Sequence, residues 1–130
     1  MRTPSPLRNL AAQGFAALAF MAQVACNQPR GFEPEVRGGD AVRGRAVLIQ
    51  FECGACHRIP GIPAARGNVG PNLEDFRRRP YIAGSLANTP ESLVRWLVDP
   101  PALAPESAMP AVGIDANQAR DIAAFLYALE

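Results

Sequence analysis

Apolar residues recur at helical spacing in three segments of this 130-residue chain, and no segment keeps the alternation of a strand. The first segment runs from Asp40, a candidate N-cap, to about Glu52. Its apolar face includes Gly44, where the missing side chain would let another helix approach closely. The pattern predicts a mainly helical, all-α domain.

The second predicted helix has a marked start and a marked stop. Thr89 is a candidate N-cap, Pro90 suits the first helical position, and the helix ends at Asp99, before two prolines. Trp96 lies on its apolar face together with two leucines. These limits depend on residues with strong backbone preferences.

The third predicted helix starts at Asp115, and Gln118 is placed to complete a capping box. Its apolar residues continue at helical spacing to the end of the chain, so we expect it to pack across Gly44. The remaining segments, about 59–88 and 100–113, are loops rich in Pro and Gly. Such long loops are unusual in a small domain unless they wrap a bound group.

The first 26 residues differ from the rest of the chain. A start with two arginines precedes a mostly apolar stretch from Leu10 to Ala25, which is short for a membrane span and typical of a secretory signal. Residues 27–39 carry two prolines, three glycines and four charges, which predicts a flexible tether. The expected organisation is a signal peptide over 1–26, the tether, and a domain over 40–130.

Cys26 follows Val24 and Ala25, an order similar to a bacterial lipoprotein signal, in which the cysteine is acylated. Gln23 departs from that pattern, because an aliphatic residue is usual there. Cleavage nearby with Cys26 left inert, or an uncleaved anchor, stays open as an alternative. We expect an exported, periplasmic protein that is attached to the membrane.

The charge balance narrows the classes of partner. The chain has 13 basic residues against 12 acidic ones, a formal net charge of +1. This gives no broad positive field, so a nucleic acid held through its phosphates is excluded as a partner. Every basic residue is Arg, so chemistry that needs a lysine amine is excluded as well.

Directly after the first helix the chain reads Cys53-Gly54-Ala55-Cys56-His57. C-x-x-C-H is the attachment signature of c-type haem: two thiols form thioethers with the haem, and the histidine is the proximal iron ligand. A thioredoxin-like redox pair belongs to a βαβ setting that is missing here, and a zinc site lacks a second pair of ligands. The motif therefore predicts one covalently bound haem c.

Met109 is the only methionine after the predicted signal segment, and the single histidine is already assigned. We expect its sulfur to be the distal iron ligand, with Pro110 stiffening the backbone that holds it. The alternative is a methionine that fills a gap in the core.

Together these residues resemble the class I cytochromes c, and within them the cytochrome c domain fused to subunit II of some bacterial cytochrome c oxidases. The resemblance covers residues 44–129. It rests on Gly44-Arg45, the Cys53–His57 motif, Gly70-Pro71-Asn72-Leu73, Tyr81-Ile82-Ala83-Gly84, Asn88-Thr89-Pro90, Trp96, Asp99-Pro100, Met109-Pro110 and Ala124-Phe125-Leu126. It implies the class I fold, with helices and loops wrapped around one haem and the terminal helices crossed.

The resemblance also implies two contacts. The Pro71 carbonyl would accept a hydrogen bond from His57 Nδ1, and Gly44 would meet Phe125 where the terminal helices cross. The chain departs from the pattern because the copper-binding domain and membrane helices of subunit II are absent, and because residues 104–106, Ala-Pro-Glu, replace a common Lys-Pro-Gly. We therefore expect a free-standing carrier or accessory subunit.

An iron that keeps both His and Met has no site open for O₂ or peroxide, so we expect a single-electron carrier with no catalytic residues. Its partners would be exported or membrane redox proteins of a respiratory chain, such as a terminal oxidase or a quinol-oxidising complex. Two alternatives stay open. One is the electron-accepting subunit of a periplasmic dehydrogenase; the other is a gas sensor or peroxidase, if Met109 is not a ligand.

Two further residues are candidates for contact with the haem. Arg77-Arg78-Arg79 is the densest run of charge; it is either a solvated loop or the source of an Arg, Arg79, that binds a haem propionate. The Trp96 N–H could bind a propionate too, or the ring could simply pack in the core. We expect the exposed haem edge beside the Gly54-Ala55 and Met109 loops, with no dominant charged docking patch.

Overall fold

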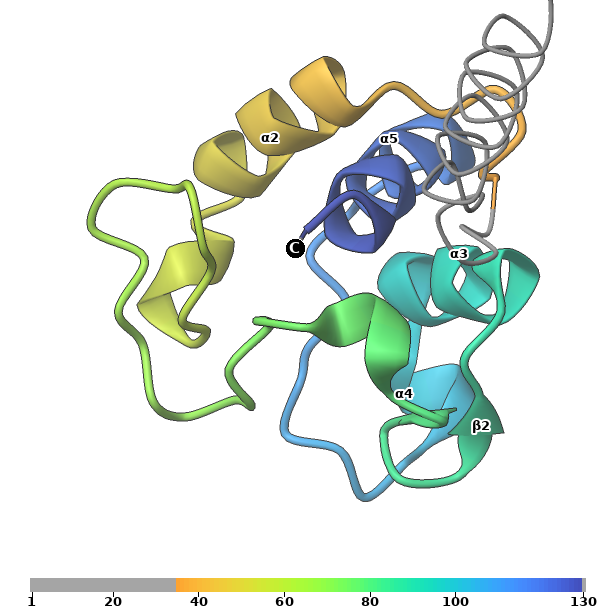
Figure 1. The fold of residues 1–130 in the computed structure, drawn as a ribbon. Helices are drawn as coiled ribbons and strands as arrows, with labels where there is room; N and C mark the ends of the chain where they lie inside the picture. The colour runs from red at the N-terminus through yellow and green to blue at the C-terminus, as the bar shows by residue number, and fades with distance from the viewer. Residues whose placement is uncertain (1–34, 130) are drawn as a thin grey trace, which may run out of the picture. The chain divides into compact units, whose positions relative to one another are not determined.

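The computed structural model describes residues 35–129, in which helices predominate (Figure 1). In chain order the elements are α2 Ala41–Gln50, the 3-10 turns η2 Cys53–Ala55 and η3 Phe76–Arg78, the short strands β1 Tyr81–Ile82 and β2 Leu86–Ala87, α3 Pro90–Val98, α4 Pro100–Leu103 and α5 Ala116–Tyr127. The predicted all-α class is confirmed.

The predicted signal peptide, the lipidation candidate Cys26 and residues 27–34 of the predicted tether lie outside the described residues. The last part of the tether forms a turn in which the Gly39 N–H donates to the Val36 carbonyl (3.0 Å), and Val36 packs against the core. Between residues 35 and 129, no helix combines the length and the apolar character needed to cross a membrane.

The three predicted helix starts are present, because each has a side chain that satisfies free backbone N–H groups. The Asp40 and Thr89 side chains each accept the N–H three residues further on, at 2.9 and 3.2 Å. At α5 the capping box is complete: Asp115 Oδ1 accepts the Gln118 N–H (2.9 Å), and Gln118 Oε1 accepts the Asp115 N–H (3.0 Å).

Helices α2 and α5, which are far apart in the sequence, cross closely at Gly44 (Figure 1). A Cβ at Gly44 would lie 1.9 Å from the Asp121 carbonyl oxygen. The nearest atoms therefore belong to the backbone of Asp121 and Ile122, about one turn before the expected Phe125. The carboxylate of Asp121 fixes this register by accepting the Asp40 N–H (2.8 Å) and two N–H groups of Arg43 (2.9 Å each).

The expectation of uninterrupted loops was wrong at two places. The segment 81–87 is a small antiparallel hairpin, whose turn has positive φ at Ala83 and Gly84. Its strands have two residues each, too few to show an alternating pattern. The two prolines after Asp99 also begin the single turn α4, because they suit the first helical positions and Asp99 Oδ1 accepts the Ala102 N–H (3.2 Å).

The core lies between α2, α3 and α5 and continues under the loops. Its most deeply buried large side chains are Leu93 of α3 and Ile122 of α5. Loops 53–73 and 104–114 leave this core and return to it. The helices and loops together surround one apolar cavity, described next.

Candidate haem-binding site

The C-x-x-C-H segment begins just after the end of α2. Glu52 adopts a left-handed conformation (φ 51°), which turns the chain out of the helix and into η2. The Cys56 and His57 N–H groups then both donate to the Cys53 carbonyl, at 3.3 and 3.0 Å. This compact turn sets the two thiols and the imidazole close together along the chain.

A second segment, residues 67–73, packs directly against this turn. The Gly67 N–H donates to the Gly54 carbonyl (3.0 Å), and the Gly70 N–H donates to the Cys56 carbonyl (2.9 Å). A Cβ at Gly67 would lie 2.3 Å from the carbonyl carbon of Cys56, and one at Gly70 would lie 2.3 Å from Cε1 of His57. Both positions therefore require glycine to let the two segments meet.

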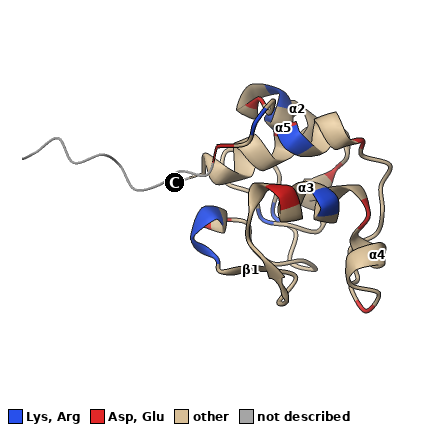
Figure 2. Cartoon of the chain, turned by 90° about the vertical axis from the view of Figure 1, so that its right-hand side faces the viewer, with Lys and Arg blue, Asp and Glu red and all other residues tan. Residues whose placement is uncertain are grey.

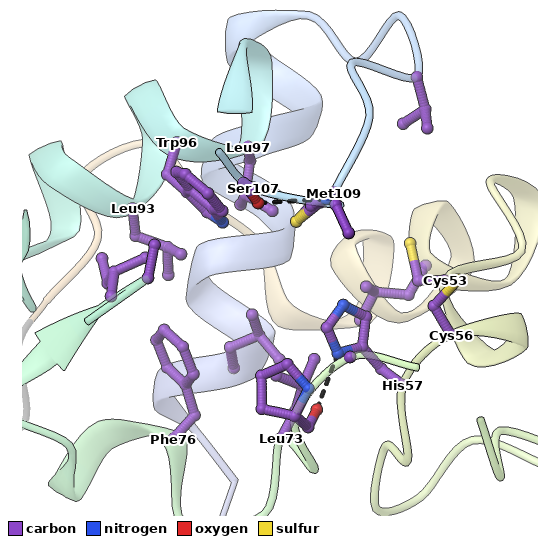
Figure 3. A pocket seen from close by; sticks show the side chains of 18 of the residues that line it. Cys53, Cys56, His57, Leu73, Phe76, Leu93, Trp96, Leu97, Ser107 and Met109 are labelled. Atoms are coloured by element: carbon purple, nitrogen blue, oxygen red, sulfur yellow. Dashed lines mark hydrogen bonds between the residues drawn. The ribbon is translucent and has the colours of Figure 1, made fainter. Parts of the chain in front are cut away.

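The imidazole of His57 is held in one orientation. Its Nδ1 lies 2.8 Å from the Pro71 carbonyl oxygen, as the resemblance implied. A carbonyl can only accept, so Nδ1 carries the proton of this hydrogen bond, and the neutral ring in this tautomer has its lone pair on Nε2. Figure 3 shows the other ring nitrogen directed into the cavity, toward Met109.

The cavity has a volume of about 370 Å³, within the range of small-molecule and cofactor sites, roughly 300–1,000 Å³. Its wall is mostly apolar side chains of the core. Every described residue predicted for the site lines it, namely Cys53, Cys56, His57, Pro71, Arg79, Trp96 and Met109. The structure thus brings together residues from five separate segments of the chain.

Met109 reaches the cavity from the loop after α4 and faces His57 across it (Figure 3). The Ser107 hydroxyl accepts the Met109 N–H (3.1 Å), a local bond that helps to fix the methionine backbone. The sequence interpretation missed Ser107. Its position two residues before Met109 is a signal that could have identified it, because a serine hydroxyl often accepts the backbone N–H two residues further on.

Of the three consecutive arginines, only Arg79 lines the cavity. Its guanidinium donates to the Asn72 carbonyl and to the Glu74 carbonyl (3.3 Å), and it lies over the Phe76 ring, 5.8 Å from the centroid. Arg78 instead pairs with Asp75 (3.4 Å) and is largely exposed, as a solvated loop requires.

Asn88 belongs to the residues on which the resemblance rests, but the sequence interpretation gave it no role. Its Nδ2 donates to the Phe76 carbonyl (3.0 Å) and to the Arg79 carbonyl (2.9 Å), while its Oδ1 accepts the Tyr127 hydroxyl (2.7 Å). Burial raises the pKa of Tyr127 to about 12. Asn88 therefore connects α5 to the segment that carries Arg79, a contact between distant residues that no local pattern signals.

The two thiols differ in their exposure to solvent. Cys53 is partly buried and burial raises its pKa, whereas Cys56 is exposed; neither forms a disulfide. Within the described segment 35–129, no three His, Cys, Asp or Glu side chains come together as metal ligands. The side chains at this site that could hold a cofactor are two thiols, one imidazole and one thioether.

These residues fit a covalently attached haem. The cavity is lined mostly by apolar side chains, it carries two free thiols (Figure 3), and an imidazole nitrogen faces a thioether sulfur across it. The only ionised side chain among its lining residues that could meet a carboxylate is Arg79. Imidazole and thioether are both established axial ligands of haem iron.

Comparison with known proteins agrees with this geometry. Residues 41–130 match the family model described as Cytochrome c. The chain is 38% identical over 71 residues to "Cytochrome c oxidase subunit 2" of Alkalihalophilus pseudofirmus, which covers 55% of this chain and 20% of the relative. It is 36% identical over 80 residues to the protein of the same name from Bacillus sp. strain PS3, covering 59% and 22%. The matched region spans about a fifth of the length of these curated relatives.

Proposed function

We propose that this chain, which belongs to the cytochrome c family, carries one covalently bound haem and transfers single electrons between redox proteins. The observation that carries the proposal is the pairing of His57, held through Nδ1 by Pro71, with Met109 on the opposite side of the cavity. If both side chains bind the iron of a haem held in this cavity, they would leave it no free coordination position.

Each residue has a separate part in this proposal. Cys53 and Cys56 would hold the haem as thioethers, His57 and Met109 would ligate its iron, and Arg79 would offer a positive charge to its carboxylates. When bound, the haem supplies a one-electron couple in which the ferric and ferrous states keep the same ligands.

The surrounding residues would orient the iron ligands and exclude water from the cavity. The Pro71 carbonyl makes the imidazole a better electron donor by accepting a hydrogen bond from its Nδ1–H, and this bond prevents rotation of the ring. Trp96, which is 7% exposed, closes the cavity from α3 and excludes water on that side. A neutral thioether and an apolar wall both favour the less charged ferrous centre.

The similarity to proteins named cytochrome c oxidase subunit 2 supports a terminal oxidase as the electron acceptor. The apolar stretch from Leu10 to Ala25, which is typical of a secretory signal, supports an exported chain attached to the membrane. Under this proposal the chain is a carrier or an accessory subunit and has no catalytic residues of its own.

The experiment is an absorption spectrum of the exported protein, first oxidised and then reduced with dithionite. We expect a sharp reduced α-band of haem c and, in the ferric protein, the weak near-infrared band of sulfur ligation. Met109→Ala should abolish the near-infrared band, because no other methionine lies in residues 35–129. Ser107→Ala is the control: it removes the hydrogen bond to the Met109 N–H but keeps the sulfur, so the band should remain.

Two other spectra would contradict the proposal. A five-coordinate or high-spin spectrum of the wild type, or a ferrous spectrum shifted by carbon monoxide, would favour gas sensing or peroxidase chemistry. A protein without any haem spectrum would remove electron transfer altogether.

A further inference from the structure

The exposed apolar side chains of the domain are concentrated at the mouth of the cavity. Five large hydrophobic residues between 35 and 129 are exposed, and three of them also line the cavity: Val69 (74% exposed), Tyr81 (56%) and Val112 (40%). They come from three separate segments: the loop before Pro71, strand β1 and the loop after Met109. We name these three residues the apolar rim.

The segments that carry the apolar rim contain no ionised side chain. Residues 67–73, 80–90 and 107–114 have no Asp, Glu, Lys or Arg, although charged residues are frequent in the rest of the domain. In Figure 2 the ribbon at β1 is tan, whereas charged residues colour parts of α2, α3 and the segment before the hairpin. Arg79, the one cation in the cavity wall, is already bonded to two backbone carbonyls.

We propose that the apolar rim is a docking surface for a redox protein whose own contact face is apolar and uncharged. This inference rests on the proposed function, because it assumes that electrons leave through the mouth of the cavity. A partner with a charged face would lose hydration of its ions against the rim without gaining an opposite charge. An uncharged apolar face pays no such cost and gains from the removal of apolar surface from water.

The size of the rim fits a brief encounter. Three side chains around one opening make a small patch, and weak redox complexes bury less than about 1,200 Å² in total. Tyrosine is enriched in the centres of interfaces, and Tyr81 supplies one here. Complexes formed through this surface should therefore dissociate quickly, and the rate at which they form should be nearly independent of salt concentration.

The test uses the rate of electron self-exchange between ferric and ferrous copies of the haem-loaded protein, measured from NMR line widths. A second copy of the chain is the probe, because it presents the same uncharged apolar rim. Between about 0.01 M and 1 M salt the Debye length falls from about 30 Å to about 3 Å. We expect the rate to change by less than about threefold over this range, whereas charge steering changes rates by about 10- to 1,000-fold.

Substitutions at the rim give the second readout. Val69→Asp with Val112→Asp should lower the rate by at least about tenfold at low salt, with partial recovery at high salt, because ionised groups must lose water and repel each other. Val69→Ser with Val112→Ser should lower the rate without any recovery by salt. Val42→Asp is the matched control: it is 82% exposed on α2 and does not line the cavity, so the rate should stay within about twofold.

Three results would overturn the inference. One is a wild-type rate that depends steeply on salt; another is a rate unaffected by the aspartates at the rim. The third is a stable dimer, detected by sedimentation, that forms through the rim. It would show that the rim is a permanent interface between two copies of the chain. The haem spectrum separates the two proposals: a variant with a normal spectrum and an altered exchange rate tests the rim alone, and a wild type without haem contradicts the proposed function.

Discussion

Gly70 illustrates how a single residue controls the geometry of the site. A Cβ at this position would lie 2.3 Å from Cε1 and 2.7 Å from Nδ1 of His57, closer than atoms of real side chains approach. Either the imidazole or the backbone that carries the Pro71 carbonyl must move if a side chain is added. The hydrogen bond from Nδ1 to Pro71 depends on both.

We predict that Gly70→Ala changes the ligation of His57. The added methyl should weaken or break the hydrogen bond to Pro71, shift the haem spectrum and lower the free energy of unfolding by at least about 1 kcal/mol. Gly61→Ala is the control, because Gly61 has no atom within 4 Å of an added Cβ. Gly61 differs from Gly70 in having a positive φ (73°), so its variant tests backbone strain without a contact to His57. It should cost backbone strain of about 1 kcal/mol and leave the spectrum unchanged. Identical spectra for both variants would contradict the prediction.

At this scale the site residues with local signals could be predicted from the sequence, whereas those defined by distant partners could not. The spacing of Cys53, Cys56 and His57 along the chain is itself the signature of the group they hold. Gly67 and Asn88 act on segments that lie far away in the sequence, so no window of neighbouring residues signals their roles.

At the scale of elements, the crossing of α2 and α5 depends on the absence of a side chain at Gly44. We predict that Gly44→Ala lowers the free energy of unfolding by about 1–3 kcal/mol, because the new Cβ would lie 1.9 Å from the Asp121 carbonyl oxygen and would force the helices apart. At an exposed position inside a helix, replacing Gly with Ala instead raises the free energy of unfolding by about 1 kcal/mol. Denaturant unfolding of the loaded protein measures it.

Val42→Ala serves as the control on the same helix. Val42 is 82% exposed, so its truncation should change the free energy of unfolding by no more than about 0.5 kcal/mol. A Gly44→Ala protein as stable as Val42→Ala would show that the helices do not approach as closely as described.

The bond between Tyr127 and Asn88 joins α5 to the residue that follows the hairpin, and Asn88 in turn bonds to the segment before the hairpin. Tyr127→Phe should cost about 1–3 kcal/mol of unfolding free energy at neutral pH, because Asn88 Oδ1 loses its donor in a half-buried place. The raised pKa of Tyr127, about 12 against about 10 in the unfolded chain, means that folding favours the neutral hydroxyl. The wild-type advantage should thus be complete below about pH 10 and shrink as the pH rises toward 12.

Urea unfolding of both proteins between neutral pH and about pH 11 measures this difference. An advantage that grows with pH, or that is absent at neutral pH, would contradict the assigned hydrogen bond.

The helices could be predicted from the sequence because their starts depend on neighbours. Asp40, Thr89 and Asp115 each cap the helix that follows, within three residues. The hairpin at 81–87 and the turn α4 could not, because strands of two residues carry no periodicity and prolines after Asp99 suit both the end of one helix and the start of another. The register of α5 on α2 also required the distant contact of Asp121 with Arg43.

At the scale of the described domain, the core and the cavity share the same walls. Leu48, Leu93, Leu97 and Leu126 belong to the buried core and also line the cavity. A chain that cannot retain a group in this space leaves those side chains without contacts on one side. Close packing of the helices therefore depends on what fills the cavity.

We predict that Cys53→Ala with Cys56→Ala, which removes both attachment points, abolishes the cooperative thermal transition of the domain. Helical circular dichroism should persist in part, while near-ultraviolet signals from fixed aromatic side chains should be lost, as in a molten globule. Val42→Ala, carried through the same preparation, should keep the transition of the wild type. A double variant that unfolds cooperatively at the wild-type temperature would show that the core is complete without an attached group.

The crossing at Gly44 has a consequence for the continuity of the chain. Because α2 and α5 hold each other through backbone contact and through the bonds of Asp121 to Asp40 and Arg43, the intervening residues form a loop closed by non-covalent contacts. A single proteolytic cut at an exposed loop position, for example after Arg66, would leave two fragments that each carry one of these helices. The domain is thus suited to being split and reassembled from two separately made pieces.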